Sequence, residues 1–215
     1  MALTTINAQV EQGTILIGGM GGFNSYTSES TTVTGGTTVT VQNPKTTMVN
    51  LSPYFGYLVT ESLAVGLGIG FESTTTVWDD FPAAGDKQTD KTSITTVTPG
   101  IRYYYVHLDN THLFAHLGIP IGFGKVTHEE NIGGTATTTE SKIMSFGVGI
   151  RPGLSINVGE KCALEAMYGF LGYTSSTTTS DGVNYLEEPY TQEDKSSSFG
   201  LEWANTFSFG IIFTL

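Results

Sequence analysis

Along most of the chain, bulky apolar residues alternate with small or polar ones, position by position. The pattern is clearest in residues 63–72, where Leu, Val, Ile and Phe at odd positions alternate with Ala, Gly and Glu at even ones. Successive side chains of a strand point to opposite faces, so this period of two predicts strands with one bulky and one small face. The alternation recurs in eight stretches, at residues 13–26, 47–59, 63–72, 95–106, 112–125, 143–156, 162–173 and 199–215.

The connections between these stretches alternate in length. Three are short, at 60–62, 107–111 and 157–160, whereas the others are longer and rich in Thr, Ser, Asp and Glu. The segment Thr31 to Thr40 places Thr and Val around a Gly-Gly pair, which predicts a hairpin that is polar on both faces and extends beyond a bilayer into water. We therefore predict an all-β fold, an eight-stranded antiparallel transmembrane β-barrel in an up-and-down meander, with four long loops at one end.

The bulky face of such strands could point inward, as in a soluble lipocalin-like barrel or a sandwich, or outward into lipid. The period alone does not decide between them. However, a glycine-rich face with few lysines is a poor solvent surface and suits the narrow interior of an eight-stranded barrel. The bulky face is also aromatic near both ends, like the interfacial girdles of membrane barrels. These residues are Tyr57, Tyr103, Tyr105 and Phe213 near the short turns, and Phe71, Phe123, Phe146, Phe170 and Trp203 near the long loops.

Composition agrees with a membrane barrel. Charged residues make up only 13% of the chain and there are 27 glycines, unlike a soluble α/β enzyme. The net charge of -11 argues against nucleic-acid binding and against a polybasic contact with anionic lipid. Cys162 is the single cysteine, so no disulfide framework or cysteine-based metal site exists. Because no apolar run approaches the ~18 residues of a membrane helix, strands would have to do the spanning.

The two ends of the chain have features of exported proteins. Residues 1–12 lack the basic region and full apolar core of a signal peptide, although Ile6-Asn7-Ala8 would suit the end of one. We interpret 1–12 as a signal remnant or N-terminal tail and 13–215 as the barrel domain. The closing residues resemble the C-terminal signal that outer-membrane barrels present to their assembly machinery, with a Leu where Phe is usual. The matching positions are Ser208, Gly210, Phe213 and Leu215.

A hairpin pattern recurs along the chain. Ser-Pro-Tyr-Phe-Gly-Tyr at 52–57 is followed by Leu-Ala-Val-Gly-Leu-Gly at 63–68, and related sequences occur at 98–103 and 151–154. The pattern resembles the small outer-membrane β-barrel domain family common in Bacteroidetes, and the architecture is similar to the OmpA and OmpX type. The resemblance covers about 13–215. It implies a bacterial outer-membrane location and the barrel-assembly machinery as a partner, but no single activity.

The predicted inward face has one ionisable residue on each of strands three to eight. These residues are Glu72, Arg102, His116, Arg151, Glu165 and Glu202. A charge inside a narrow barrel has to find a partner. We therefore predict a salt-bridged plug, in which Arg102 and Arg151 are shared between Glu165 and Glu72. A proton or ion path is the functional alternative to this structural polar core.

Catalysis on a small outer-membrane barrel would need a His with a nearby Ser or Asp at the lipid face or the outer rim. The four histidines do not fit this requirement. His107 and His112 lie at the predicted short-turn end, His116 points inward, and His128 belongs to the acidic loop segment 128–130. We predict no catalytic residue, no cofactor and no metal site.

The sequence favours a non-enzymatic integral outer-membrane protein whose protruding loops act in adhesion or in association with an envelope complex. Extended Thr-rich edges would expose unpaired backbone groups that can accept a partner strand. The expected partners are the lipid bilayer and either another envelope protein or an extracellular ligand. The alternative is a narrow, porin-like channel for small solutes or ions, which six ionisable groups in the lumen disfavour.

Overall fold

The computed structural model describes residues 11–34, 37–79, 85–108, 110–183, 189–202 and 208–215. Among these residues, side chains are described everywhere except at 28–43, 182–189 and 202. All regular structure in these residues is β-strand. No helix in the described part of the chain is long and apolar enough to cross a membrane. The strands are β1 Ile15–Thr34, β2 Thr37–Thr60, β3 Leu63–Asp79, β4 Lys87–Leu108, β5 Thr111–Gly118, β6 Ile121–Ile132, β7 Thr135–Gly159, β8 Cys162–Met167, β9 Phe170–Val183, β10 Pro189–Glu202 and β11 Ser208–Thr214.

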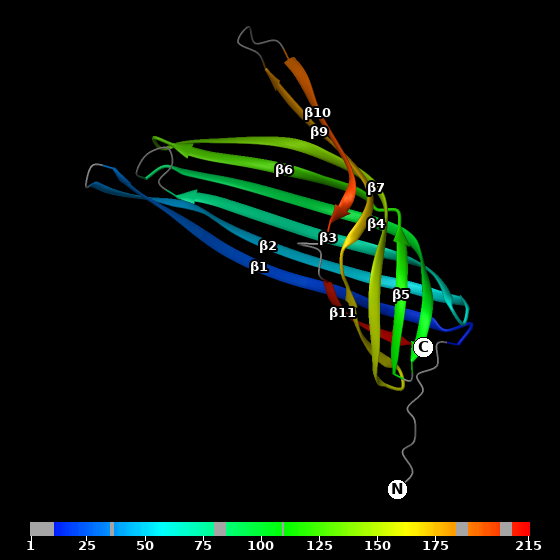
Figure 1. The fold of residues 1–215 in the computed structure, drawn as a ribbon. Coiled ribbons are helices and arrows are strands. Elements are labelled where there is room, and N and C mark those ends of the chain that lie inside the picture. The colour runs from blue at the N-terminus through cyan, green and yellow to red at the C-terminus, as the bar shows by residue number, and fades with distance from the viewer. Residues whose placement is uncertain (1–10, 35–36, 80–84, 109, 184–188, 203–207) are drawn as a thin grey trace.

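The eleven strands form eight antiparallel passes (Figure 1). Five passes are single strands, and three are each described as two strands, namely β5 with β6, β8 with β9, and β10 with β11. β11 pairs with β1 on one side, where Thr214 lies opposite Leu16, and with β8 on the other, where Phe213 lies opposite Cys162. The ring of strands therefore closes in the half that contains the short turns. The predicted eight-stranded antiparallel meander is confirmed.

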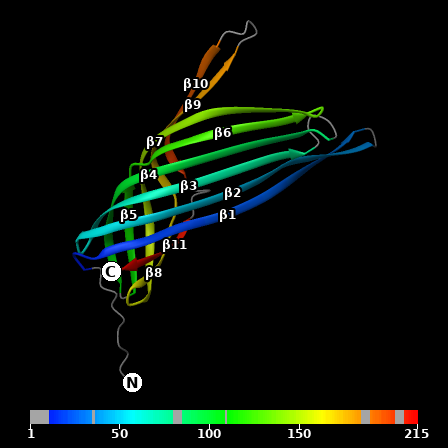
Figure 2. The same ribbon diagram turned by 180° about the vertical axis from the view of Figure 1, so that it is seen from behind.

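In the other half of the ring, the described residues show no pairing between β1 and β10. The described part of β11 pairs with β1 as far as Met20, and β10 pairs with β9 along its length. β9 pairs with β7 from Leu171 to Ser180, and the β9–β10 hairpin points in a different direction from the far ends of β1 to β4 and β6 (Figures 1 and 2). The predicted continuous strand 199–215 is thus described as two strands. Trp203 lies outside the described residues.

The predicted long loops are largely strand. β3 continues to Asp79, and β4 already begins at Lys87. Gly133 and Gly134 alone join β6 to β7, and their φ angles of 58° and 82° suit a two-residue type I′ turn. The loop prediction was wrong because a segment that is polar on both faces can still be a strand when pairing satisfies its backbone groups. The molecule therefore has long two-stranded extensions in place of loops.

Bulky residues point outward and small ones inward along most passes, as the alternation predicted. The outward apolar side chains that form a band around the closed half are exposed. They include Phe55, Leu67, Ile101, Ile150, Leu164 and Ile211. The predicted aromatic girdle residues Tyr57, Tyr103, Tyr105, Phe213, Phe71, Phe123 and Phe146 are exposed as well.

Phe170, predicted on the outward face, and Tyr173, which the alternation in 162–173 predicts on the inward face, lie on the opposite faces. Phe170 is buried and Tyr173 is 37% exposed. Between β8 and β9, Gly169 has a φ of 75°, a left-handed conformation that favours glycine. The irregular step at Tyr168 and Gly169 shifts the alternation by one residue, as a bulge does. A strict period of two cannot be followed through such a step, so the sequence assigned the two aromatic residues to the wrong faces.

Glycines of the inward face make room for aromatic rings from other positions in the lumen. A Cβ atom at Gly153 would meet the ring of Phe114, one at Gly66 would meet Tyr54, and one at Gly149 would meet Phe170. These glycines therefore leave space for large aromatic side chains. The aromatic rings fill the interior of the closed half.

Candidate functional site

A buried ion pair crosses the lumen of the closed half. Arg102 on β4 donates a hydrogen bond from Nη1 to Oε1 of Glu165 on β8, and the two atoms are 2.6 Å apart. The residues are 2% and 4% exposed. β4 and β8 are not neighbours in the sheet. The pair therefore ties together two separated parts of the ring, away from water.

Aromatic rings surround the guanidinium of Arg102. Its Cζ atom lies 4.8 Å from the ring centroid of Tyr54 and 4.1 Å from that of Phe114. Its Nη1 atom also donates to the hydroxyl of Tyr104 at 3.3 Å. Stacked aromatic faces and a carboxylate are favourable surroundings for a desolvated guanidinium. The period of two predicts the inward face for these aromatic residues, but their common role was not predicted. The presence of inward aromatic residues near inward glycines is the signal that could have indicated it.

The lumen is filled on the short-turn side of this pair. A buried cluster there is formed by Leu16, Leu58, Ala64, Tyr104, Phe114, Ala163 and Ile212. Leu58, Ala64 and Phe114 are 0% exposed. Together with the ion pair, these residues form what we call the floor of the lumen. The floor separates the two ends of the barrel.

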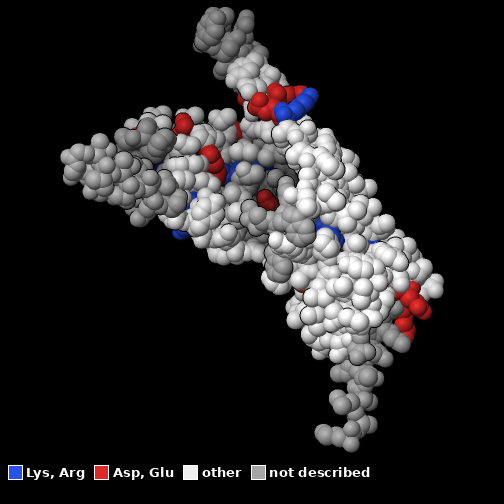
Figure 3. Space-filling view, in the orientation of Figure 1, with Lys and Arg blue, Asp and Glu red and all other residues white. Residues whose placement is uncertain are grey.

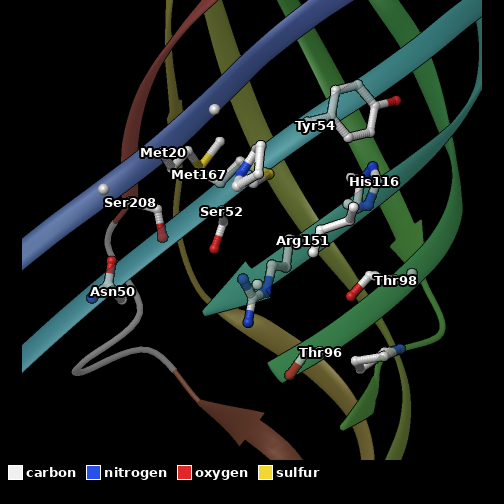
Figure 4. A pocket seen from close by; sticks show the side chains of 18 of the residues that line it. Met20, Asn50, Ser52, Tyr54, Thr96, Thr98, His116, Arg151, Met167 and Ser208 are labelled. Carbon is white, nitrogen blue, oxygen red and sulfur yellow. The ribbon is translucent and has the colours of Figure 1, made fainter. Parts of the chain in front are cut away.

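A cavity of about 500 Å³ lies against the floor, on the side of the long extensions. Figure 3 shows this face of the molecule hollowed, with acidic and basic atoms within and around the hollow. Polar side chains from β2 and β4, including Ser52, Thr96 and Thr98, line part of the cavity. In the close view of Figure 4, Arg151 extends toward the centre of the cavity, while His116 and Tyr54 lie together at one side.

Three polar atoms of cavity-lining residues are buried without a hydrogen-bond partner among the described residues. They are the hydroxyl oxygen of Tyr54, Nε of Arg102 and Nδ1 of His116. The two rings meet edge to face, with their centroids 5.9 Å apart. Arg151 lies opposite His116 in the β5–β7 register, and its Cζ is 5.4 Å from the ring centroid of Phe170. Hydrogen-bonding groups and a cation therefore meet next to the floor.

The structure places the six predicted interior residues in three ways. Arg102, His116, Arg151 and Glu165 all line the cavity near the floor, and Arg102 is paired with Glu165. Glu72 also lines the cavity but is exposed, so it lies outside the buried ion pair. The backbone of Glu202 lies opposite Phe170, and its side chain is outside the described ones. That these residues act together as a functional network stays a prediction.

The other three histidines occupy two further places. At the short-turn end, Nδ1 of His107 lies 3.2 Å from Nδ1 of His112. His128 was predicted in a loop but lies on β6, where Nδ1 contacts the carboxylate of Asp90 and Nε2 is 2.9 Å from Oε1 of Glu130. The hydrogen bond to Asp90, and then that to Glu130, raise the pKa of His128. In the described chain, no group of three or more His, Cys, Asp or Glu side chains could hold a metal ion.

Comparison with known proteins supports the fold. No protein-family model matches the chain, and no curated protein gives a significant match. The crystal structure of the outer membrane protein OprG from Pseudomonas aeruginosa is similar, with a TM-score of 0.52, 14% identity, and coverage of 95% of this chain and 97% of that one. Ail of Yersinia pestis has a TM-score of 0.36 at 14% identity, covering 95% and 99%, and Neisserial surface protein A has 0.33 at 13%, covering 95% and 98%. At this identity, the likeness to OprG concerns the fold alone.

Proposed function

We propose that this chain is a non-enzymatic integral protein of the bacterial outer membrane, whose outer strand extensions bind another envelope component or an extracellular ligand. The observation that carries this proposal is the contrast between the two halves of the barrel. One half is filled by the floor, with Arg102 and Glu165 almost completely buried. The strands of the other half continue well beyond the length that a bilayer requires.

Strand length and surface chemistry support a membrane position. β2, β4 and β7 contain 24, 22 and 25 residues, whereas a tilted strand crosses a bilayer in about 9–11. The apolar band of exposed side chains surrounds the closed half, and the surplus length is rich in Thr and Ser. An apolar band of this kind is stable in lipid and would aggregate in water. The fold shared with OprG, which is itself an outer membrane protein, is consistent with this location.

Unpaired strand edges support a binding role. Beyond Met20, β1 pairs only with β2, and β10 pairs only with β9, within the described residues. The backbone groups along such edges can form hydrogen bonds with an added strand. Glu193 and Asp194 on β10 are exposed, and Lys195 pairs with Glu193 at 2.9 Å, so a negative charge remains on this edge at Asp194. We infer that the partner contributes an extended segment, with cationic side chains near β10.

The alternative function is a channel for small solutes or ions, and the cavity with its polar lining is the observation in its favour. Conduction would require a wet path through the floor. Planar-bilayer recording tests the two functions against each other. Steady single-channel steps that disappear on lumen substitution would establish the channel and contradict the proposal.

Partner capture supplies the other half of the test. The intact protein in native outer membranes is crosslinked and purified beside a variant in which Thr31 to Thr40 is replaced by a two-residue turn. We expect a partner with the intact protein, loss of that partner with the shortened β1–β2 hairpin, and no conductance with either. Capture that is unaffected by shortening both this hairpin and the β9–β10 hairpin would contradict a role for the extensions.

We also propose that the closing strand addresses the chain to the barrel-assembly machinery. Phe213 and Leu215 are exposed on the outward face, whereas Gly210 and Ser208 are only partly exposed. A Cβ at Gly210 would meet the backbone of Gly19, so this glycine also has a packing role. Phe213→Ser should reduce assembly in cells while leaving refolding in detergent intact. Equal loss in both would indicate a purely structural role.

The Bacteroidetes affiliation stays a prediction.

A further inference from the structure

The cavity above the floor has the form of a small-molecule site. Its volume of about 500 Å³ falls within the range of roughly 300–1,000 Å³ found for ligand sites. The floor closes one end, because Leu58, Ala64 and Phe114 beneath it are completely buried. A solute that enters from the side of the long extensions would therefore stop at the level of Arg102 and Glu165.

The polar groups at the bottom of the cavity suit an anionic head group. The hydroxyl of Tyr54 can donate a hydrogen bond, and it is buried without a partner among the described residues. Nδ1 of His116 is likewise buried without a partner among the described residues. A buried polar atom without a partner is unfavourable, so a ligand acceptor would gain from Tyr54, and also from His116 in the tautomer that carries its proton on Nδ1.

Buried donors and basic side chains at the bottom of the cavity favour a ligand acceptor over a ligand cation. Arg151 lies opposite His116 and reaches into the cavity (Figure 4). Nη1 of Arg102 is bonded to Glu165, but its Nε is a further buried donor without a partner among the described residues. A carboxylate could therefore accept hydrogen bonds from Tyr54 and Arg102 while its charge lies near Arg151. Glu72 also lines the cavity, but its side chain is exposed. The planar fork of a guanidinium matches a carboxylate well.

Apolar side chains form another part of the wall. Met20, Met167, Phe170 and Ile212 line the cavity from β1, β8, β9 and β11. Methionine side chains adapt to apolar groups of varied shape. We propose that the cavity binds a small carboxylate with an apolar body, with the carboxylate next to Tyr54, His116 and Arg151. This site does not depend on what the outer extensions bind.

Calorimetry with the full chain in lipid nanodiscs tests the proposal. The probe is 3-phenylpropionate, the neutral comparison is 3-phenylpropan-1-ol, and empty nanodiscs provide the background. We expect the acid to bind at least about tenfold more tightly than the alcohol, because a charge-assisted pair contributes to the acid alone. The proposal would be overturned if the acid did not bind at about 10 mM. Equal affinity for the acid and the alcohol would also overturn it.

Two variants assign the binding to this cavity. Tyr54→Phe and Arg151→Met should each weaken binding of the acid by about tenfold, through loss of the hydroxyl or of the cation. Lys125→Met also removes one positive charge, but from an exposed side chain of β6 outside the cavity, and should leave the affinity unchanged. Unaltered affinity in both cavity variants would overturn the assignment.

Folding and the origin of the ligand are checked separately. Heat-modifiable migration on a detergent gel identifies folded barrels, and Tyr54→Phe keeps the ring that stacks on Arg102, so one cavity variant should remain measurable. Palmitate carries the same carboxylate and could come from the membrane. Tighter binding of palmitate would assign the ligand to the bilayer, and tighter binding of the short acid would assign it to external solutes. Either result supports a carboxylate site.

Discussion

Phe114 and Gly153 lie directly opposite each other on β5 and β7, and the ring of Phe114 occupies the space where a side chain at position 153 would be. The ring is 0% exposed and packs over the guanidinium of Arg102. One glycine thus allows a large aromatic residue to help close a narrow barrel. The relationship can be tested directly, because the Phe114 ring and a side chain at position 153 would occupy the same space.

Gly153→Ala should destabilise the barrel by about 1–3 kcal/mol, since the nearest atoms to a Cβ at this position belong to the Phe114 ring. Adding Phe114→Leu should relieve part of this cost, so the two changes should be coupled by about 0.5–3 kcal/mol. Urea unfolding in lipid vesicles measures both quantities. Gly200→Ala is the control, because a Cβ there meets nothing within 4 Å. Strictly additive effects would contradict the packing relationship.

Arg102→Met should destabilise the folded protein by about 3–5 kcal/mol, because the carboxylate of Glu165 would remain buried without its partner. Arg102→Met combined with Glu165→Leu should recover most of the loss, since no buried charge is then left. The same unfolding assay applies. Lys125→Met interrupts the exposed pair with Glu140 and should change stability little. If the double variant is as unstable as the single one, the ion pair itself is stabilising.

Ile150→Arg should disturb insertion, because Ile150 belongs to the exposed apolar band and is 44% exposed. An arginine near the middle of a bilayer costs a barrel about 2–4 kcal/mol. Thr138→Arg is the matched control on β7, where the side chain is exposed in the outer extension. Folding efficiency into vesicles and unfolding free energy are the measurements. Equal tolerance of both substitutions would place β7 outside the membrane.

The His128 contacts should make the outer extensions pH-dependent. Hydrogen bonds to Asp90 and Glu130 raise the pKa of His128 above its unfolded value of about 6.5. Folding therefore favours protonated His128. Its contribution to the free energy of unfolding is complete below the pKa of the unfolded state and is lost as pH rises through the pKa of the folded state. The stability difference between the wild type and His128→Gln should shrink as the pH rises above about 6.5 and through the raised pKa. Asp90→Asn should lower the pKa seen by NMR, and an unchanged value would contradict the pairing.

The sequence alone determined the strand architecture, because the period of two is a local property of the backbone. Alternation such as Leu63 to Phe71 against Ala64 to Glu72 assigned most passes to the correct faces, and turns such as Glu61-Ser62 separated them. The inward positions of Arg102, His116 and Glu165 followed from the same rule. These inferences needed no knowledge of which strands meet across the lumen.

Tertiary structure decided what the local pattern could not contain. The pairing of Arg102 with Glu165 depends on how far each strand is staggered around the ring, and this stagger leaves no mark in the sequence of either strand. The step at Gly169 reversed the faces of Phe170 and Tyr173, because one irregular residue changes the parity of all that follow. Polar segments were read as loops since only a partner strand reveals whether their backbone groups are paired. The cavity, finally, exists because eight separate passes enclose it, and volume is a property of their arrangement rather than of any one of them.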